Sequence, residues 1–413
     1  MNPKSNSRRK FIGQMSCAAL GYTTFYNSFI NLQAINALCA SNSALDPSYK
    51  ALVCINLSGG NDSFNMLVPT STEEYKTYSK TRANLAIPKN ELLKLNTLNT
   101  PGREFGLHPS LSGLQSMFNK GNAAFISNVG TLLEHTNKTA IYDNKAKLPL
   151  GLLSHSDQGM SWQTGIPQSR GNVGWVGRMG DLIQDMNKSK DISMNISLSG
   201  SNLLETGKEI VEYVLDPTQG SIGINGYRPD NMYDIVNIAK TKAIDSLLDH
   251  QYLDVFQKTY VDVVRNARDG NLLFQGALEN GPEIKTTFSD NDFSKSLNMI
   301  ARTISVHEQL GFKRQVFYVN FYGWDHHDEV LQNQVDMFNI VNDGLVEFYA
   351  AMEELNLTKQ VATFSISEFG RSLTSNGNGT DHAWGGNSFI IGGDLNGSRI
   401  FGDYPALDLE NDL

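Results

Sequence analysis

Carboxylates and imidazoles gather with glycine in four short segments, residues 59–63 (GGNDS), 323–328 (GWDHHD), 367–371 (SEFGR) and 379–386 (GTDHAWGG). Carboxylate oxygens and imidazole nitrogens are ligands that divalent metals such as zinc take in proteins. The first three segments directly follow predicted strands, and ligands bind at the carboxyl ends of parallel strands because the loops converge there. Together the segments predict a divalent-metal site at one edge of a sheet.

Each segment also has a structural interpretation that the sequence leaves open. The first segment is typical of a turn, since Gly, Asn and Asp tolerate positive φ. Asp325 or Asp328 could cap the helix that follows them. Glu368 and Arg371 could form a buried ion pair, and Asp381 could belong to another turn. It is the position of all four segments at strand ends that favours a functional site.

A fifth segment, residues 153–158 (LSHSDQ), contributes Ser154. A nearby cation lowers the pKa of a serine hydroxyl and screens its approach to an anionic phosphorus or sulfur centre, so Ser154 is a candidate nucleophile. The alternative is a polar loop serine next to a helix cap.

The elements that must position these segments alternate between strands and helices. Continuous apolar runs predict buried strands at residues 51–57, 123–127, 315–321, 360–365 and 388–391. Helical patterns cover residues 231–250, 253–267, 292–310 and 329–355, and residues 217–229 are typical of a loop. Apolar strands separated by helices predict one large α/β domain, a three-layer sandwich with a mostly parallel central sheet.

The first 44 residues have the pattern of an export signal. Arg8 and Arg9 precede Lys-Phe-Ile, an apolar stretch follows, and small residues come after it. The adjacent arginines resemble the twin-arginine motif, which implies the twin-arginine translocase as a partner during export. The stretch is too polar for a stable membrane span. We therefore expect a mature domain of residues 45–413, in the periplasm or at the cell surface and not integral to the membrane.

Composition excludes several other classes of protein. The chain has 413 residues, of which 40% are hydrophobic and 19% charged, so it can bury a large core. Its net charge is −9 and it has no basic block beyond the first ten residues, which argues against nucleic acid as a partner. Of its three cysteines only Cys54 lies beyond the leader, so the mature domain has no internal disulfide.

Taken in order, the segments resemble the family called domain of unknown function 1501. The resemblance rests on the twin-arginine leader and on six runs: LSGGNDSFNMLVP, FGLHPSL, SHSDQGMSWQTG, GWDHH, SEFGR and GNGTDHAWGG. That family is similar to the alkaline phosphatase and sulfatase superfamily. The resemblance implies an alkaline-phosphatase-like α/β sandwich with a metal-bearing edge, which agrees with the argument from strand ends.

The resemblance also implies roles for single residues. It assigns metal ligation to Asp62, Asp325, His327, Glu368, Asp381 and His382. It makes Ser154 the nucleophile, with His155 or Arg371 binding the charged oxygens of the substrate. Two departures from the superfamily pattern are the tight Asp-x-His spacing at Asp325 and a Ser-Glu-Phe sequence where many phosphatases carry Asp-His. The second departure leaves open whether one ion or two are bound.

The function that follows is an exported, metal-dependent hydrolase of phosphate or sulfate esters, with a small molecule or a glycan ester as substrate. Zinc is the expected metal, with manganese or calcium as alternatives. One alternative function is a non-catalytic envelope protein that keeps the fold and binds metal, glycan or a partner. Another is a serine esterase, but the mature chain lacks the Gly-Asp-Ser and late Asp-x-x-His blocks of that class.

Overall fold

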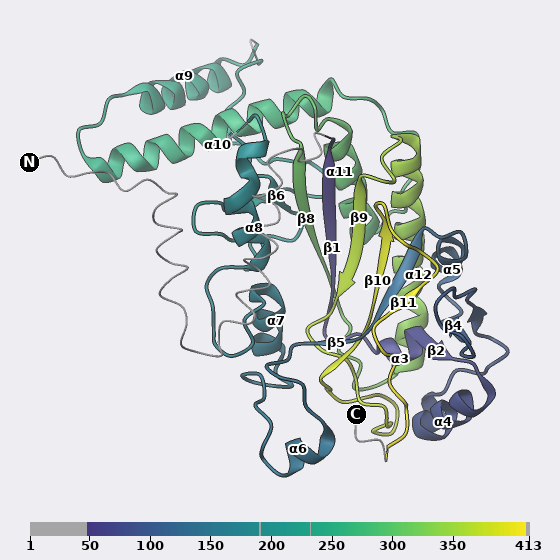
Figure 1. Ribbon diagram of the computed structural model, residues 1–413. Coiled ribbons are helices and arrows are strands. Elements are labelled where there is room, and N and C mark those ends of the chain that lie inside the picture. Colours follow the sequence, from purple (N-terminus) through teal and green to yellow (C-terminus); the bar gives the residue numbers. More distant parts are fainter. Residues whose placement is uncertain (1–47, 190, 232, 410–413) are drawn as a thin grey trace, which may run out of the picture. The chain divides into compact units, whose positions relative to one another are not determined.

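The three longest strands of the main sheet's parallel part form from the apolar runs of the sequence. In the computed structural model, which describes residues 48–189, 191–231 and 233–409, β1 is Lys50–Ser58, β8 is Arg314–Tyr322 and β9 is Val361–Ile366. They are parallel with β1 in the middle, so that Ile55 lies opposite Val319 of β8 and Ser365 of β9. Their carboxyl ends, and the loops that follow them, therefore meet at one edge of the sheet (Figure 1).

The main sheet has eight strands in the order β11-β5-β10-β9-β1-β8-β6-β7. The other strands are β5 (Ala123–Gly130), β6 (Asn195–Ser197), β7 (Tyr213–Val214), β10 (Gly385–Gly392) and β11 (Ile400–Phe401). β10 runs antiparallel to both of its neighbours, β5 and β9, and the remaining pairs are parallel. The prediction of an α/β protein with a mostly parallel sheet is confirmed. The start of β10, rather than its end, lies at the edge where β1, β8 and β9 finish.

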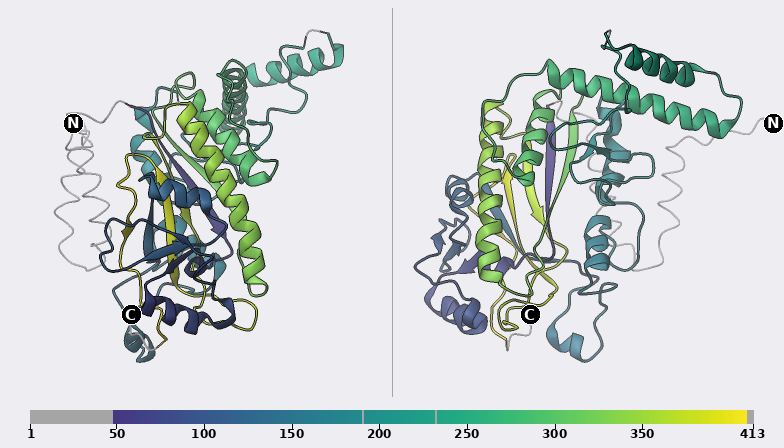
Figure 2. Two further views of the ribbon diagram at one scale, coloured as in Figure 1. Left: turned by 90° about the vertical axis from the view of Figure 1, so that its right-hand side faces the viewer. Right: turned by 180° about the vertical axis from the view of Figure 1, so that it is seen from behind.

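Helices pack against both faces of this sheet. On one face are α11 (Asp292–Ser305) and α12 (Val330–Glu354), which lie in front of the strands when the molecule is seen from behind (Figure 2). On the other are α7 (His155–Thr164) and α8 (Trp175–Ile183). Phe293 of α11 contacts Phe321 with ring centroids 5.1 Å apart, and Trp175 lies 6.5 Å from Phe364. Phe321 and Phe364 align with β1 positions 57 and 54, whose side chains point to opposite faces.

The remaining elements surround this sandwich. The helices are α3 (Ser63–Met66), α4 (Thr72–Arg82), α5 (Ser112–Asn119), α6 (Lys138–Tyr142), α9 (Ile235–Asp249) and α10 (Val255–Glu279), with 3-10 turns at Ala83–Leu85 and Gln184–Met186. A small antiparallel sheet joins β2 (Leu67–Pro69), β4 (Phe105–Leu107) and β3 (Leu93–Lys94). No helix in the described ranges is long and apolar enough to cross a membrane. The predicted export signal, residues 1–44, lies outside the described residues.

Two expectations about the helices are wrong in detail. The helix predicted over residues 253–267 continues to Glu279 as α10. Neither Asp325 nor Asp328 caps α12: the residue before this helix is Glu329, with φ 49°, and no side chain caps the helix there. Asp328 Oδ1 instead accepts from the adjacent Glu329 N at 2.9 Å. The other predicted strands and helices are present with their ends shifted by a few residues, and residues 217–229 contain only turns, an isolated bridge and irregular backbone.

Candidate functional site

Loops from four elements bring the candidate residues to the same edge of the sheet. Asp325 follows β8, Glu368 follows β9, His382 precedes β10, and His155 is the first residue of α7. The loop after β1 passes so close to Asp325 that a Cβ on Gly59 would lie 2.4 Å from the Asp325 backbone nitrogen. Gly59 also has φ +123°, so only glycine fits this position without strain.

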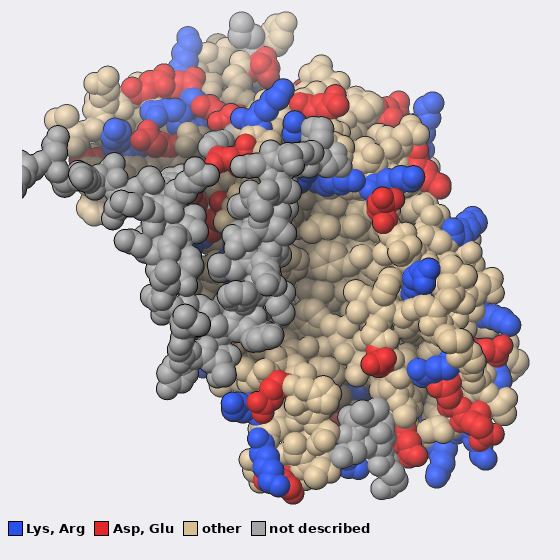
Figure 3. Space-filling model, in the orientation of Figure 1, with Lys and Arg blue, Asp and Glu red and all other residues tan. Residues whose placement is uncertain are grey.

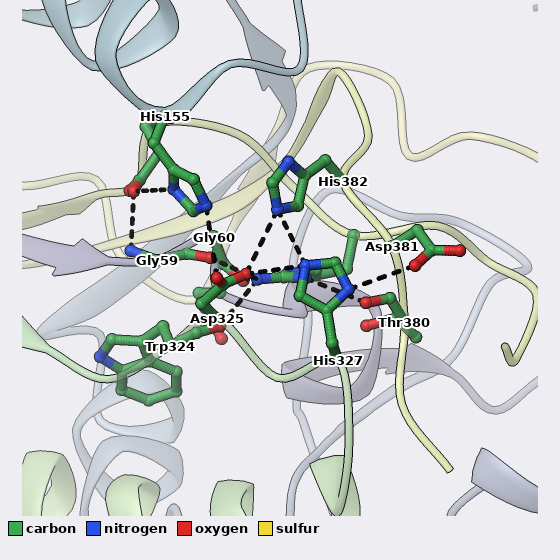
Figure 4. A network of polar contacts seen from close by, with 12 residues as sticks. Gly59, Gly60, His155, Trp324, Asp325, His327, Thr380, Asp381 and His382 are labelled. Atoms are coloured by element: carbon green, nitrogen blue, oxygen red, sulfur yellow. Dashed lines mark hydrogen bonds and ion pairs between the residues drawn. The ribbon is translucent and has the colours of Figure 1, made fainter. Parts of the chain in front are cut away.

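Three histidines surround the Asp325 carboxylate (Figure 4). Its Oδ1 lies 3.2 Å from Nε2 of both His327 and His382, and its Oδ2 lies 3.4 Å from Nε2 of His155. The Nε2 atoms of His327 and His382 are 3.1 Å apart. Ligand atoms of His155, Asp325 and His382 all lie within 4.8 Å of one another. We call Asp325 and the three histidines the Asp–His cluster.

In each of the three histidines, a contact of Nδ1 orients the ring so that Nε2 points toward Asp325. Nδ1 of His382 lies 2.8 Å from the Leu153 carbonyl oxygen, which can only accept, so Nδ1 must donate. Nδ1 of His155 lies 3.0 Å from Glu368 Oε1, and Nδ1 of His327 lies 3.2 Å from Asp381 Oδ1. In neutral imidazoles this arrangement places the lone pairs of all three Nε2 atoms toward the acceptor oxygens of Asp325.

These separations fit a single small cation. Two ligands bound to zinc at about 2.05 Å in tetrahedral geometry stand about 3.3 Å apart. Four separations within the Asp–His cluster, 3.1 to 3.4 Å, have this size, and the ligand atoms of His155, Asp325 and His382 all lie within 4.8 Å of one another. Hydrogen bonds from metal-bound histidines to carboxylates or backbone carbonyls are also the usual outer support of such sites, as Glu368, Asp381 and Leu153 provide here.

Arg371 is buried behind the cluster and holds Asp325 in place. Its guanidinium donates to the carbonyl oxygens of Gly59 (2.5 Å), Gly60 (2.9 Å) and Thr380 (2.9 Å), and also to Asp325 Oδ1. With 1% of its surface exposed, it ties three loops together instead of facing solvent. The Glu368–Arg371 ion pair considered from the sequence is not formed, because Arg371 pairs with Asp325 and Glu368 pairs with His155.

Both carboxylates that flank His327 are held in the ionised form. Burial opposes ionisation of Asp325, but the buried Arg371 guanidinium, which donates to Oδ1, lowers the pKa of this carboxyl below its ordinary value. The hydrogen bond from Asn376, followed by His327, lowers the pKa of Asp381. Two ionised carboxylates therefore flank His327 at neutral pH.

Ser154 is the residue before α7 and is held between two parts of the cluster. Its Oγ accepts from Asp157 N at 3.4 Å and lies 3.2 Å from Ser156 Oγ, so it caps the helix. The residue on one side, Leu153, contacts His382 through its carbonyl, and the residue on the other is His155. Leu153 has φ +72°, a conformation that leucine rarely adopts and that often marks functional sites.

Asp62 lies apart from these contacts. Its Oδ2 lies 2.5 Å from Nη2 of Arg82, and both side chains are fully buried. Within the described part of the chain, Asp62 is not among the residues whose ligand atoms converge, so its role as a metal ligand stays a prediction. His326 turns inward as well, with its ring 5.9 Å from Trp324, and burial, followed by Arg371, lowers its pKa.

Sequence reasoning therefore pointed to most of the cluster but missed two of its supports. The Leu153 carbonyl has no side-chain signal in the sequence. Phe369, which is 2% exposed, backs the imidazoles, with ring centroids 4.4 Å from His382 and 4.8 Å from His155. Phe369 belongs to the Ser-Glu-Phe run, which stands where many phosphatases carry Asp-His. This departure from the pattern is the only sign of Phe369 in the sequence.

Comparison with known proteins identifies one family. The model of a family described as "Protein of unknown function (DUF1501)" matches residues 49–412. A comparison with curated proteins finds no match.

Several solved structures are similar over most of the chain at low sequence identity. Lipoteichoic acid synthase LtaP from Listeria monocytogenes has 8% identity and a TM-score of 0.32, covering 86% of this chain and 68% of its own. Ps i-CgsB has 10% identity and a TM-score of 0.33, covering 87% and 70%. A multiply substituted alkaline phosphatase PafA has 14% identity and a TM-score of 0.28, covering 80% and 64%.

Proposed function

The chain belongs to the family described as Protein of unknown function (DUF1501), and from this premise we propose that it is a metal-dependent hydrolase of phosphate or sulfate esters. The observation that carries the proposal is the convergence of three imidazole nitrogens on the Asp325 carboxylate. The three imidazole Nε2 atoms each lie 3.2 to 3.4 Å from an oxygen of the ionised Asp325 carboxylate, and those of His327 and His382 lie 3.1 Å from each other. When the imidazoles are neutral and carry their protons on Nδ1, these four groups are all acceptors, which repel one another unless a cation lies between them.

His155, Asp325 and His382 would hold the ion, and His327 supplies a fourth donor. Nitrogen donors favour zinc over calcium, which takes oxygen ligands. The described residues contain one such group, so we propose one ion. When bound, a divalent ion polarises the ester oxygen and lowers the pKa of a nearby hydroxyl.

In this proposal Ser154 is the nucleophile. Its two neighbours in the chain both contact the Asp–His cluster or belong to it, Leu153 through its carbonyl and His155 through its ring. The serine oxygen would lose its proton to water and form a bond to phosphorus or sulfur as the bond to the alcohol oxygen breaks, and the departing alkoxide would take a proton from water. A second water would then hydrolyse the serine ester, which returns the proton to serine and releases phosphate or sulfate. Arg371 acts as a positioning residue, because its guanidinium is buried against backbone carbonyls and Asp325.

We also propose that the protein works outside the cytoplasm, after passage through the twin-arginine translocase. This part of the proposal rests on the sequence of residues 1–44, with Arg8 and Arg9.

The first test is the metal content of the purified full chain. We expect one equivalent of zinc by mass spectrometry, and Asp325→Ala lowers zinc affinity by at least about 100-fold because it removes the central carboxylate. Asp336→Ala, the same change on an exposed part of α12, retains zinc and serves as the control. A wild-type protein that binds no divalent metal would overturn the proposal.

The second measurement is hydrolysis of 4-nitrophenyl phosphate and 4-nitrophenyl sulfate. We expect zinc-loaded wild type to cleave at least one of them and Ser154→Ala to lower kcat/KM by about 1,000-fold. Equal rates in the two proteins would remove Ser154 from the mechanism. Zinc binding without hydrolysis would favour a binding protein, and cleavage of 4-nitrophenyl acetate without metal would favour a serine esterase.

A further inference from the structure

A groove of about 510 Å³ opens directly beside the Asp–His cluster. One wall is the sheet face formed by the ends of β1 and β8, and the other is α7. Its inner end is formed by His155, Gly59 and Glu368, so a ligand in the groove touches the cluster. Figure 3 shows a hollow over β1 and β9 that is lined mainly by uncharged residues, with charged side chains mostly around the hollow.

Neutral hydrogen-bonding groups line the sheet side of the groove. Asn56 of β1 and Asn320 of β8 are directly opposite each other in the parallel register. Asn56 Nδ2 donates to Asn320 Oδ1 at 3.0 Å and to the Tyr318 hydroxyl at 3.1 Å. These contacts fix the orientation of the amide groups and leave the hydroxyl hydrogen of Tyr318 and the amide hydrogens of Asn320 to be donated to a ligand.

Aromatic rings frame the same groove. Tyr322 ends β8 with 67% of its surface exposed, and Trp162 of α7 lies on the opposite wall. Trp162 Nε1 is buried and has no hydrogen-bond partner within the described part of the chain. Flat rings next to a few oriented polar groups are typical of sites for small ligands with both apolar and hydroxyl-bearing faces.

This combination selects one class of ligand. No lysine or arginine lines the groove among the described residues, so a polyanion would find no countercharge away from the cluster. A lipid chain would leave the amide hydrogens of Asn320 and the hydroxyl hydrogen of Tyr318 without an acceptor, at a cost of about 1–3 kcal/mol for each group. A sugar ring satisfies both requirements, since its hydroxyls pair with amides and its C–H faces pack on aromatic rings.

We propose that the groove binds a neutral saccharide, which is the alcohol half of an ester whose charged group lies at the Asp–His cluster. The position of the charged half rests on the proposed function. The saccharide site itself rests on Asn56, Tyr318, Asn320, Tyr322 and Trp162 and needs no metal.

The test is calorimetric titration of the full chain, treated with chelator, with neutral tetrasaccharides of glucose, of galactose and of N-acetylglucosamine. We expect at least one to bind in the micromolar to millimolar range. Tyr322→Ala and Asn320→Ala weaken that binding by about 10-fold or more, and circular dichroism confirms that both variants fold. Tyr260→Ala, an exposed tyrosine on α10, leaves binding unchanged and serves as the control.

Failure of this proposal is distinguishable from failure of the proposed function. Saccharide binding that persists in Asp325→Ala supports the groove even if no ester is hydrolysed. The proposal is overturned if none of the three tetrasaccharides binds at concentrations up to about 10 mM, at which even weak binding to a single site is detected. It is also overturned if Tyr322→Ala binds as tightly as Tyr260→Ala.

Discussion

The pair of Asp62 and Arg82 shows how a single contact can carry much of the stability near the site. Both side chains are fully buried. Arg82 also donates to Asn65 Oδ1 at 3.1 Å and to the Ser372 carbonyl at 3.0 Å, so it links the segment after β1 to the loop after β9. Removing one partner of such a pair leaves an uncompensated buried charge, which costs more than the pair contributes as a whole.

We therefore predict strong coupling between these two residues. Asp62→Asn and Arg82→Met each lower the free energy of unfolding by about 3–5 kcal/mol, and the double variant loses less than the sum because no lone charge remains. Urea unfolding of the four proteins measures the coupling. The same cycle on the exposed pair Asp143 and Lys145 should give less than about 1 kcal/mol. Loss of zinc in Asp62→Asn at unchanged stability would instead support Asp62 as a metal ligand.

Residue types, together with the position of Asp325 and His327 directly after a strand and of His382 in a Gly-rich segment, were enough to predict that these three residues meet. The contacts of the two buried arginines near the site, Arg82 and Arg371, could not be predicted in the same way. Arg82 stands at the end of α4, far from any motif, and its pairing with Asp62 depends on how that helix packs. Arg371 was expected to bind the substrate, but the sequence does not reveal that three backbone carbonyls surround its guanidinium.

At the scale of elements, the site depends on close approach between the loop after β9 and the beginning of β10. A Cβ on Gly370 would lie 2.1 Å from the Gly385 carbonyl oxygen, which is far closer than atoms can pack. The Ala383 nitrogen donates to the Gly370 carbonyl at 2.9 Å, so the two segments are also hydrogen-bonded. Arg371 and His382 are adjacent to these contacts, and an isolated bridge pairs them with each other.

Gly370→Ala should accordingly separate the two loops and displace both side chains. We expect zinc affinity to fall by about 10-fold or more, because ligands must be held within about 0.5 Å of their places, together with a lower unfolding midpoint. Calorimetric zinc titration and thermal unfolding measure the two effects. Gly276→Ala is the matched control, since a Cβ there meets nothing within 4 Å and α10 gains a better helix former. Equal zinc affinity in both variants would contradict this account.

The sequence indicated the elements with long, regular patterns and missed the short ones. β1, β8 and β9 are continuous apolar runs in the parallel core of the sheet, so their burial was visible in their composition. β6 and β7 span only Asn195–Ser197 and Tyr213–Val214, which is too short for a periodic signal. The reversed direction of β10 is set by its pairing with β5 and β9, and strand direction leaves no mark on the residues themselves.

Across the whole molecule, acidic side chains outnumber basic ones by 43 to 34. Glu205 differs from an exposed acid because it is fully buried, with its Oε2 accepting from Asn202 Nδ2 at 2.7 Å. Burial raises the pKa of Glu205 from its ordinary value of 4.5 to about 8. The folded protein thus holds a proton on Glu205 at neutral pH that the unfolded chain releases.

This difference predicts how stability changes with pH. A raised folded-state pKa gives stability that is fully present below pH 4.5 and is lost as the pH rises to about 8, with a slope of up to about 1.4 kcal/mol per pH unit. Between pH 6 and 8 in chelator, wild type should therefore lose about 2 kcal/mol more of its free energy of unfolding than Glu205→Gln, which carries no proton to release. Urea unfolding at several pH values measures both profiles. Glu209→Gln makes the same change on an exposed residue and should follow wild type. Parallel profiles for wild type and Glu205→Gln would show that Glu205 is already ionised in the fold.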